Sequence, residues 1–244
     1  MCRTCWQSLE PWRGPVCARC GIAFATVNTP DSAGWECGQC RQEAQEFDLA
    51  RSFGPYAGKL RAAILQLKFH RRERLGKRLG GLLATVWLSV EEFREAEAPL
   101  LVPVPLHPSR ERERGFNQAE LLAQGLSLRL GEASKGRGPA VDCRCLLRTR
   151  ATVPQTGLSL EARRENVRAV FAVAKPQSVR GRVVALVDDV MTTGATLSAC
   201  ARALKRAGAR QVLAITLAHA TPQMPDVEST RVRSPVDDIG ATWA

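Results

Sequence analysis

The sequence lacks several motifs and segments that would define common classes of protein. No G-x-x-x-x-G-K-[ST] motif occurs in its 244 residues, so a P-loop ATPase is not indicated. The longest apolar run, LGGLLATVWLSV at 79–90, is far shorter than the roughly 18 residues that a membrane span needs. The N-terminus is polar and rich in cysteine, unlike a signal peptide. We therefore expect a cytoplasmic protein with no membrane span.

Aromatic residues and lysine are also scarce. Aromatic residues make up 5% of the chain and are not interleaved with the basic run KFHRRER (68–74), which argues against a base-stacking groove and favours a solvated face. Only six of the 35 basic residues are lysine, yet the net charge is +11. This excess indicates polyanionic partners, such as nucleic acid or phosphorylated small molecules, or simply the arginine bias of a GC-rich genome. Both explanations stay open at this point.

Cysteine is abundant at the N-terminus. Six of the nine cysteines form three Cys-x-x-Cys pairs, CRTC (2–5), CARC (17–20) and CGQC (37–40). Such a turn lets two thiolates meet on one tetrahedral ion, and two turns complete a structural zinc site. Disulfides are disfavoured in a reducing cytosol, and a redox pair would not recur three times. The spacing predicts a zinc ribbon whose ligands are Cys17, Cys20, Cys37 and Cys40.

The remaining cysteines do not complete a second site. Cys2 and Cys5 form half a site, and no histidine precedes His70 to complete it. Either their partner pair lies upstream of Met1, or these two thiols are free. The last three cysteines stand outside any ligand spacing and are interpreted as small core residues: Cys143, Cys145 and Cys200.

The rest of the chain alternates between helical and strand-like patterns. We predict a zinc ribbon over 1–47, a second domain over 51–220, and a disordered tail over 221–244. Alternating strands and helices predict a parallel α/β sheet. The expected helices cover 53–93, 117–130 and 196–208, and the expected strands cover 100–106, 141–148, 167–173, 182–187 and 211–218.

The stretch VVALVDDVMTTGATLSA (183–199) carries the strongest functional signal. Asp188 and Asp189 follow an apolar strand, and a Thr-Gly turn leads into the next helix. Ligands gather at this edge of a parallel sheet, and amides at a helix N-terminus favour an anion. Carboxylates would repel a phosphate but could hold the hydroxyls of an attached ribose. A helix capped by threonine would explain one threonine but not the whole set. The pattern therefore predicts a ribose-phosphate site.

Here the sequence resembles known families. The segment VVALVDDVMTTGATLSACARALKRAGA is similar to the 5-phosphoribosyl-1-pyrophosphate (PRPP) signature of type I phosphoribosyltransferases. The zinc knuckles and three further segments resemble the ComF (GntX-like) family: YAGKLRAAILQLKF (56–69), LVPVPLHPSRERERGFNQAELLA (101–123) and LLRTRATVPQTGLSLEARRENVRAVF (146–171). The resemblance covers roughly 1–220 and implies a type I phosphoribosyltransferase-like parallel sheet flanked by helices, with a small N-terminal zinc ribbon.

The resemblance also implies a site. Asp188 and Asp189 would hold the ribose hydroxyls of PRPP bound with Mg²⁺, and the 5′-phosphate would lie on Thr192, Thr193, Gly194, Ala195 and Thr196. In a working transferase, cations stabilise the departing pyrophosphate. The candidates are Arg110, Arg112, Arg114, Arg148, Arg150 and Arg163, although any one of them could equally be a solvated surface residue. The predicted catalytic residues are Asp188, Asp189, Arg150 and Arg163.

Two functions follow from the resemblance, and the sequence does not choose between them. One is a phosphoribosyltransferase that acts on an unknown nitrogenous acceptor, although no segment resembles a purine or pyrimidine pocket. The other is a non-catalytic factor of DNA uptake that binds single-stranded DNA or the competence machinery. ComF proteins usually carry four Cys-x-x-Cys knuckles in a double zinc ribbon. We therefore expect another such pair upstream of Met1, with Cys2 and Cys5 as its metal-binding partners.

Overall fold

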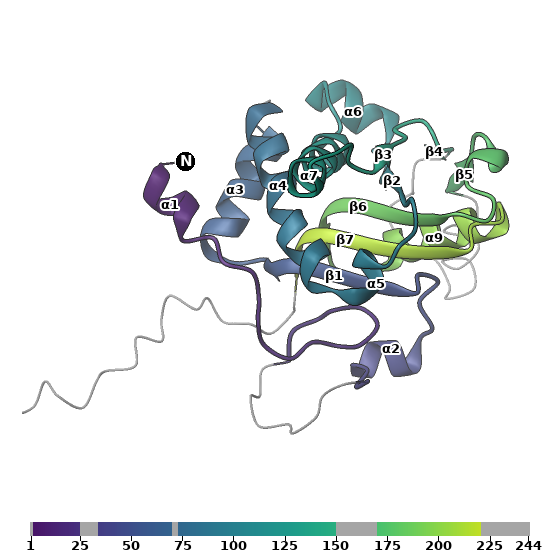
Figure 1. The fold of residues 1–244 in the computed structure, drawn as a ribbon, viewed down its shortest axis with the longest axis horizontal. Helices are drawn as coiled ribbons and strands as arrows, with labels where there is room; N and C mark the ends of the chain where they lie inside the picture. Colours follow the sequence, from purple (N-terminus) through teal and green to yellow (C-terminus); the bar gives the residue numbers. More distant parts are fainter. Residues whose placement is uncertain (1, 25–33, 70–72, 150–169, 221–244) are drawn as a thin grey trace, which may run out of the picture.

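The centre of the molecule is a five-stranded parallel sheet. The computed structural model describes residues 2–24, 34–69, 73–149 and 170–220. Its strands lie in the order β1-β7-β6-β2-β3, with every neighbouring pair parallel (Figure 1). Their bounds are β1 Leu49–Pro55, β2 Leu100–Pro103, β3 Ala140–Val141, β6 Val183–Met191 and β7 Gln211–His219. The predicted parallel α/β fold is confirmed.

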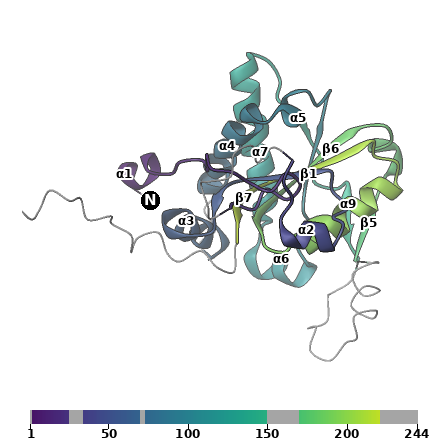
Figure 2. The ribbon, with the colours of Figure 1, turned by 90° about the horizontal axis from the view of Figure 1, so that it is seen from below.

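Helices cover both faces of this sheet. One face contacts α3 (Gly58–Phe69), α4 (Glu73–Ser89) and α7 (Gln118–Ser134), and the other face contacts α9 (Ala195–Arg206). A small antiparallel pair, β4 (Leu146–Arg148) with β5 (Phe171–Val173), lies beside α9 (Figure 2). The short elements are α1 Arg3–Gln7, α2 Gly38–Gln42, α5 Glu91–Arg94, α6 Pro108–Arg114 and η1 Pro176–Ser178. No helix of the described segments is long and apolar enough to span a membrane.

The central strand β6 supplies side chains to two separate cores. Val183, Ala185 and Val187 lie in the hydrophobic cluster that contains α3, α4 and α7. Val184 and Leu186 lie in the second cluster, with α9 and with three N-terminal cysteines. Successive side chains of a strand point to opposite faces, and here both faces are buried, which is why this strand is apolar without interruption. Its next two residues are the acids Asp188 and Asp189.

The prediction of one helix over 53–93 is wrong in two respects: the helical region begins later, and it is divided into three helices. Residues 49–55 form β1, an edge strand that pairs with β7, and the helical pattern begins only at Gly58. The sequence LARSFGP shows no clear alternation of apolar and polar residues, so it did not indicate a strand. In the structure the Arg51 guanidinium donates hydrogen bonds to the carbonyl oxygens of Cys17 and Ala18. The helical segment itself consists of α3, α4 and α5 rather than one helix.

The predicted strand over 141–148 is in fact two strands of different sheets. β3 ends at Val141, a turn follows, and β4 begins at Leu146. β4 pairs with β5 in an antiparallel manner, so the predicted strand over 167–173 is shorter and lies outside the main sheet. The Asp142 carboxylate accepts a hydrogen bond from the Arg144 N–H and stabilises the turn between the two strands. An apolar pattern alone could not reveal this break.

The arginine-rich segment after β2 forms the helix α6. His107 caps α6 by accepting a hydrogen bond from the Ser109 N–H, and Gly115 ends the helix in the left-handed region (φ 75°). Strand β2 is correspondingly shorter than the predicted 100–106. The other predicted elements agree with the structure within a few residues at each end: α7, α9, β6 and β7. The predicted tail over 221–244 lies outside the described residues.

Candidate functional site

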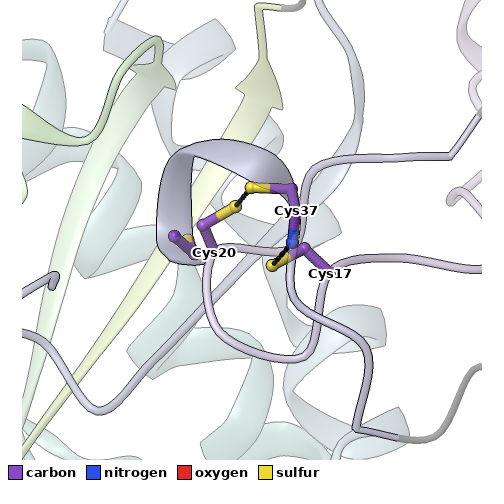
Figure 3. A group of neighbouring side chains, drawn as sticks. Cys17, Cys20 and Cys37 are labelled. Carbon is purple, nitrogen blue, oxygen red and sulfur yellow. Dashed lines mark hydrogen bonds between the residues drawn. The ribbon is translucent and has the colours of Figure 1, made fainter. Parts of the chain in front are cut away.

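The four cysteines of the predicted zinc ribbon come together. The Sγ atoms of Cys17, Cys20, Cys37 and Cys40 all lie within 4.8 Å of one another. Cys20 and Cys37 have their Sγ atoms 3.7 Å apart, and Cys17 Sγ accepts a hydrogen bond from the Cys37 N–H (Figure 3). A tetrahedral ion with metal–sulfur bonds of about 2.3 Å would place its sulfur ligands about 3.8 Å apart. The side chains therefore fit a metal ion such as zinc.

The pKa values of the four thiols differ widely. A hydrogen bond from the Cys20 thiol, with help from backbone N–H groups, lowers the pKa of Cys17 to about 4. The same hydrogen bond, together with burial, raises the pKa of Cys20 far above its ordinary range, and burial raises that of Cys40 to about 12. Binding of a metal ion must displace the protons of the other thiols.

Cys2 and Cys5 lie apart from this four-cysteine cluster. Cys2 caps the short helix α1, where its Sγ accepts a hydrogen bond from the Cys5 N–H at 3.5 Å. Trp6 of the same helix lies under the guanidinium of Arg78 at 4.0 Å, so α1 sits against α4. Metal binding by Cys2 and Cys5 stays a prediction. Of the three predicted core cysteines, Cys145 and Cys200 are buried and Cys143 is half-buried.

The two adjacent carboxylates lie at the carboxyl end of β6. The strand extends through both of them to Met191, beyond the predicted end at 187. Asp189 is 4% exposed and lies on the face covered by α3, where Lys68 Nζ reaches its Oδ2 at 3.0 Å. The basic run 68–74 was predicted to be a solvated face, and for Lys68 this is wrong, because its side chain is only 20% exposed. The tertiary structure gives the buried carboxylate a cation.

Asp188 interacts with the same ion pair and with an arginine. It accepts a hydrogen bond from the Asp189 N–H at 2.8 Å. Burial and the neighbouring charge of Asp189 raise the pKa of Asp188 to about 8, although the charge of Lys68 acts in the opposite direction. Burial lowers the pKa of Arg148, on which the charges of Arg110 and Asp188 also act. Asp188 therefore lies within electrostatic range of cationic side chains.

The Thr-Gly loop that follows, residues 192–196, is open to solvent at its side chains. Thr192, Thr193, Ala195 and Thr196 are exposed, whereas Gly194 is buried and adopts φ 78°, in the left-handed region. Helix α9 begins immediately after this glycine, and Thr193 Oγ1 accepts a long hydrogen bond of 3.4 Å from the Ala195 N–H. The first N–H groups of a helix have no partner within the helix and favour an anion. The loop has the chemistry of an anion site.

The predicted cationic residues are only partly within the described structure. Arg150 and Arg163 lie outside the described residues. Arg110 and Arg112 are exposed on α6, and Arg114 donates a hydrogen bond to Gln118 Oε1 at 3.1 Å. No sequence signal distinguished Lys68, because a single lysine within a basic run resembles any other surface residue.

The raised pKa of Asp188 makes a prediction about stability. The folded state holds this proton up to about pH 8, whereas the unfolded chain loses it near pH 4. The folded state therefore binds more protons between these values, and its stability falls as the pH rises. At pH 8 we expect the free energy of unfolding of Asp188→Asn to exceed that of the wild type by roughly 1 kcal/mol or more, so the variant unfolds at a higher temperature. At pH 4 we expect little difference. Thermal denaturation from pH 4 to pH 8 measures this, with the exposed Glu132→Gln as control. A gain independent of pH would contradict the assignment.

Comparisons with known proteins agree with this fold. The family model "Phosphoribosyl transferase domain" matches residues 117–244. The DNA utilization protein YhgH of Salmonella typhimurium is 33% identical over 213 residues, which cover 87% of each chain. The protein of the same name from Escherichia coli K12 is 35% identical and covers 81% of each chain. Competence protein F of Haemophilus influenzae is 29% identical and covers 90% of each chain.

Solved structures are more distant. The allosteric regulatory enzyme of purine biosynthesis matches 63% of this chain and 30% of its own, with a TM-score of 0.40 and 18% identity. The family assignment therefore depends on the family model and on the relatives that match over most of their length. The structure agrees with this assignment, because it has a parallel sheet flanked by helices and an N-terminal cluster of four cysteines. The chain belongs to the ComF family of proteins with a phosphoribosyltransferase domain.

Proposed function

We propose that this chain binds PRPP, or another ligand with a ribose 5-phosphate group, together with Mg²⁺ at the carboxyl end of β6. In this proposal Asp188 and Asp189 accept hydrogen bonds from the ribose hydroxyls. The 5′-phosphate binds the Thr-Gly loop, where the first amides of α9 and the threonine hydroxyls supply donors. Transfer of the phosphoribosyl group to a nitrogenous acceptor is part of the proposal, with the acceptor unspecified.

The observation that carries this proposal is the placement of the acid pair beside the loop. Three residues separate Asp188 from the first loop residue, Thr192, on the same strand-to-helix connection. The acids can then hold neutral hydroxyls while the phosphate stays at the helix terminus, where the dipole favours it. Repulsion between the carboxylates and the phosphate is avoided because the sugar ring separates them.

Arginine side chains supply the charge that a pyrophosphate group needs. The charges of Arg148 and Asp188 act on each other, and the charge of Arg110 acts on Arg148. A guanidinium presents a planar fork of donors that suits phosphate oxygens. We propose these two residues, together with the predicted Arg150 and Arg163, as the cations that would stabilise departing pyrophosphate. The four cysteines are proposed to hold a structural Zn²⁺.

Isothermal titration with PRPP and Mg²⁺ tests the binding proposal. We expect saturable binding to the wild type, weaker binding of ribose 5-phosphate because it lacks the pyrophosphate, and only weak binding of sulfate. Protection against thermal unfolding should follow the same order. The absence of both heat and protection with PRPP would refute the proposed site. Release of pyrophosphate over a panel of nitrogenous bases then tests catalysis separately.

The Lys68–Asp189 ion pair leads to a prediction for the same site. Replacing Lys68 by methionine removes the charge that lowers the pKa of Asp188, so this carboxyl stays protonated to a higher pH. A protonated carboxyl is a poorer acceptor for ribose hydroxyls. We expect Lys68→Met to weaken PRPP binding about tenfold at pH 7, which is about 1.4 kcal/mol, and to regain much of it at pH 9.

The matched control for this prediction is Lys77→Met on α4, whose side chain is exposed. It should bind PRPP as the wild type does at both pH values. Titrations at pH 7 and pH 9 measure the difference. An equal loss at both values would mean that Lys68 acts by another route than the ionisation of the acid pair.

A second candidate function is binding of single-stranded DNA. It is favoured by the net charge of +11 and by relatives named for DNA utilization and competence. Fluorescence anisotropy with a labelled oligonucleotide at increasing salt tests it. Binding that disappears at moderate salt would indicate only neutralisation of phosphates, whereas binding that persists would support recognition of the strand. PRPP should compete with the oligonucleotide if both use the Thr-Gly loop.

A further inference from the structure

The second cysteine knuckle contacts the Thr-Gly loop directly. Gln39 lies between Cys37 and Cys40, and its Nε2 donates a hydrogen bond of 3.0 Å to the carbonyl oxygen of Thr193. The two residues are 154 positions apart in the sequence. Figure 2 shows α2, which carries Gln39, close to α9, which follows the loop. The cysteines on either side of Gln39 are two of the four side chains that fit a metal ion.

Residues 45–47, which follow α2, pack against the Thr-Gly loop and the start of α9. A Cβ atom at Gly194 would lie 3.1 Å from Gln45 Oε1 and 3.4 Å from the Phe47 ring. The Glu46 N–H donates to Ser198 Oγ at 2.9 Å, and its carboxylate pairs with Arg202 of α9, also at 2.9 Å. Phe47 is fully buried, in the same hydrophobic cluster as three of the metal-site cysteines. The start of α9 is therefore fixed against the chain that leaves the metal site.

The first cysteine knuckle is attached to the sheet instead. The Ala50 N–H donates to the Arg19 carbonyl oxygen at 2.7 Å, and the Arg51 guanidinium donates to the Ala18 carbonyl oxygen at 3.0 Å. A metal ion held by all four cysteines would join this sheet-bound knuckle to the knuckle that carries Gln39. Such a cross-link lowers the conformational entropy of the segment between the two knuckles, as any loop closure does.

We propose that the four-cysteine metal module positions the Thr-Gly loop for phosphate binding, and that Gln39 is the positioning residue through which it acts. The hydrogen bond turns the Thr193 carbonyl oxygen toward the module. In a trans peptide the next N–H points the opposite way, so the Gly194 N–H is directed away from the module. A carbonyl turned into the anion site would repel phosphate. This inference rests on the proposed function only for its ligand.

Gln39→Met tests the proposal, because methionine keeps the length of the side chain, adds no charge and cannot donate. Gln42→Met is the matched control, since Gln42 ends the same helix and is exposed. We expect Gln39→Met to retain its metal, to bind PRPP about three- to tenfold more weakly, and to exchange the amide hydrogens of residues 194–197 faster. Gln42→Met should match the wild type in all three measurements. Chelation of the metal from the wild type should change affinity and exchange in the same direction, and further.

Two outcomes separate this proposal from the proposed function. If the wild type does not bind PRPP, the proposed function fails, and hydrogen exchange in the ligand-free protein still decides whether the module positions the loop. If the wild type binds PRPP but Gln39→Met equals it in affinity and in exchange, the positioning role is overturned. Loss of the metal from Gln39→Met would also overturn it, because Gln39 would then act on metal retention.

Discussion

Replacing Asp188 and Asp189 together by asparagine is expected to weaken PRPP binding by more than about 100-fold. A hydrogen bond from a hydroxyl to a carboxylate contributes about 1.5–3 kcal/mol, and each acid is proposed to accept at least one. Asparagine keeps the shape of the side chain but removes the negative charge. The variant should remain folded, because burial of Asp188 opposes its ionisation in the ligand-free protein. Isothermal titration with PRPP and Mg²⁺ measures the loss.

The single variants and a distant charge change serve as controls. Glu132→Gln lies at the end of α7 in an exposed ion pair with Arg129 and should bind PRPP as the wild type does. Asp189→Asn alone leaves Lys68 without its carboxylate partner, so this variant should be less stable than Asp188→Asn. Binding by the double variant at wild-type affinity would exclude these acids from the ligand site and remove the main support for the proposed function.

Replacing Cys17 by serine is expected to abolish the proposed metal binding and to lower the free energy of unfolding by about 3 kcal/mol or more. Cys17 is fully buried in the hydrophobic cluster that includes α9 and one face of β6. The variant therefore loses a ligand and also places a hydroxyl in a core. For a chain of this size the change corresponds to a fall of roughly 6–12 °C in Tm. Metal analysis of the purified protein and calorimetry measure both effects.

Cys143→Ser is the matched control, since Cys143 is half-buried and stands outside the metal-site cluster. It should keep about one metal ion per chain, as a four-cysteine site predicts. Because the metal site shares a core with α9, we expect Cys17→Ser to broaden or shift the main unfolding transition. A separate low-temperature transition, with the main one unchanged, would mean that the ribbon unfolds independently of the sheet. Full metal content in Cys17→Ser would refute the assignment of this ligand.

Two kinds of sequence signal predicted features of the structure correctly: the spacing of cysteines and the pattern of apolar residues. Ligand spacing in Cys17-x-x-Cys20 and Cys37-x-x-Cys40 predicted the four-cysteine cluster, because a Cys-x-x-Cys turn places its two thiols by local geometry. The continuous apolar run before Asp188 predicted a strand, and the alternation of strands and helices predicted the parallel sheet. These features depend on residues close together in the chain, where periodicity and spacing are informative.

Other features depend on contacts between distant segments, and only the tertiary structure decided them. β1 is a strand because β7 offers it an edge, and β4 leaves the main sheet because β5 pairs with it. The acid pair meets charges from other elements: Lys68 of α3 pairs with Asp189, and Arg148 of β4 lies within electrostatic range of Asp188. Gln39 contacts Thr193 although 154 residues separate them. The sequence by itself determined the cysteine spacing and the acid and threonine pattern on which the proposed sites rest. The packing of distant elements determined the partners of these residues, since side-chain contacts between elements leave no periodic trace in a sequence.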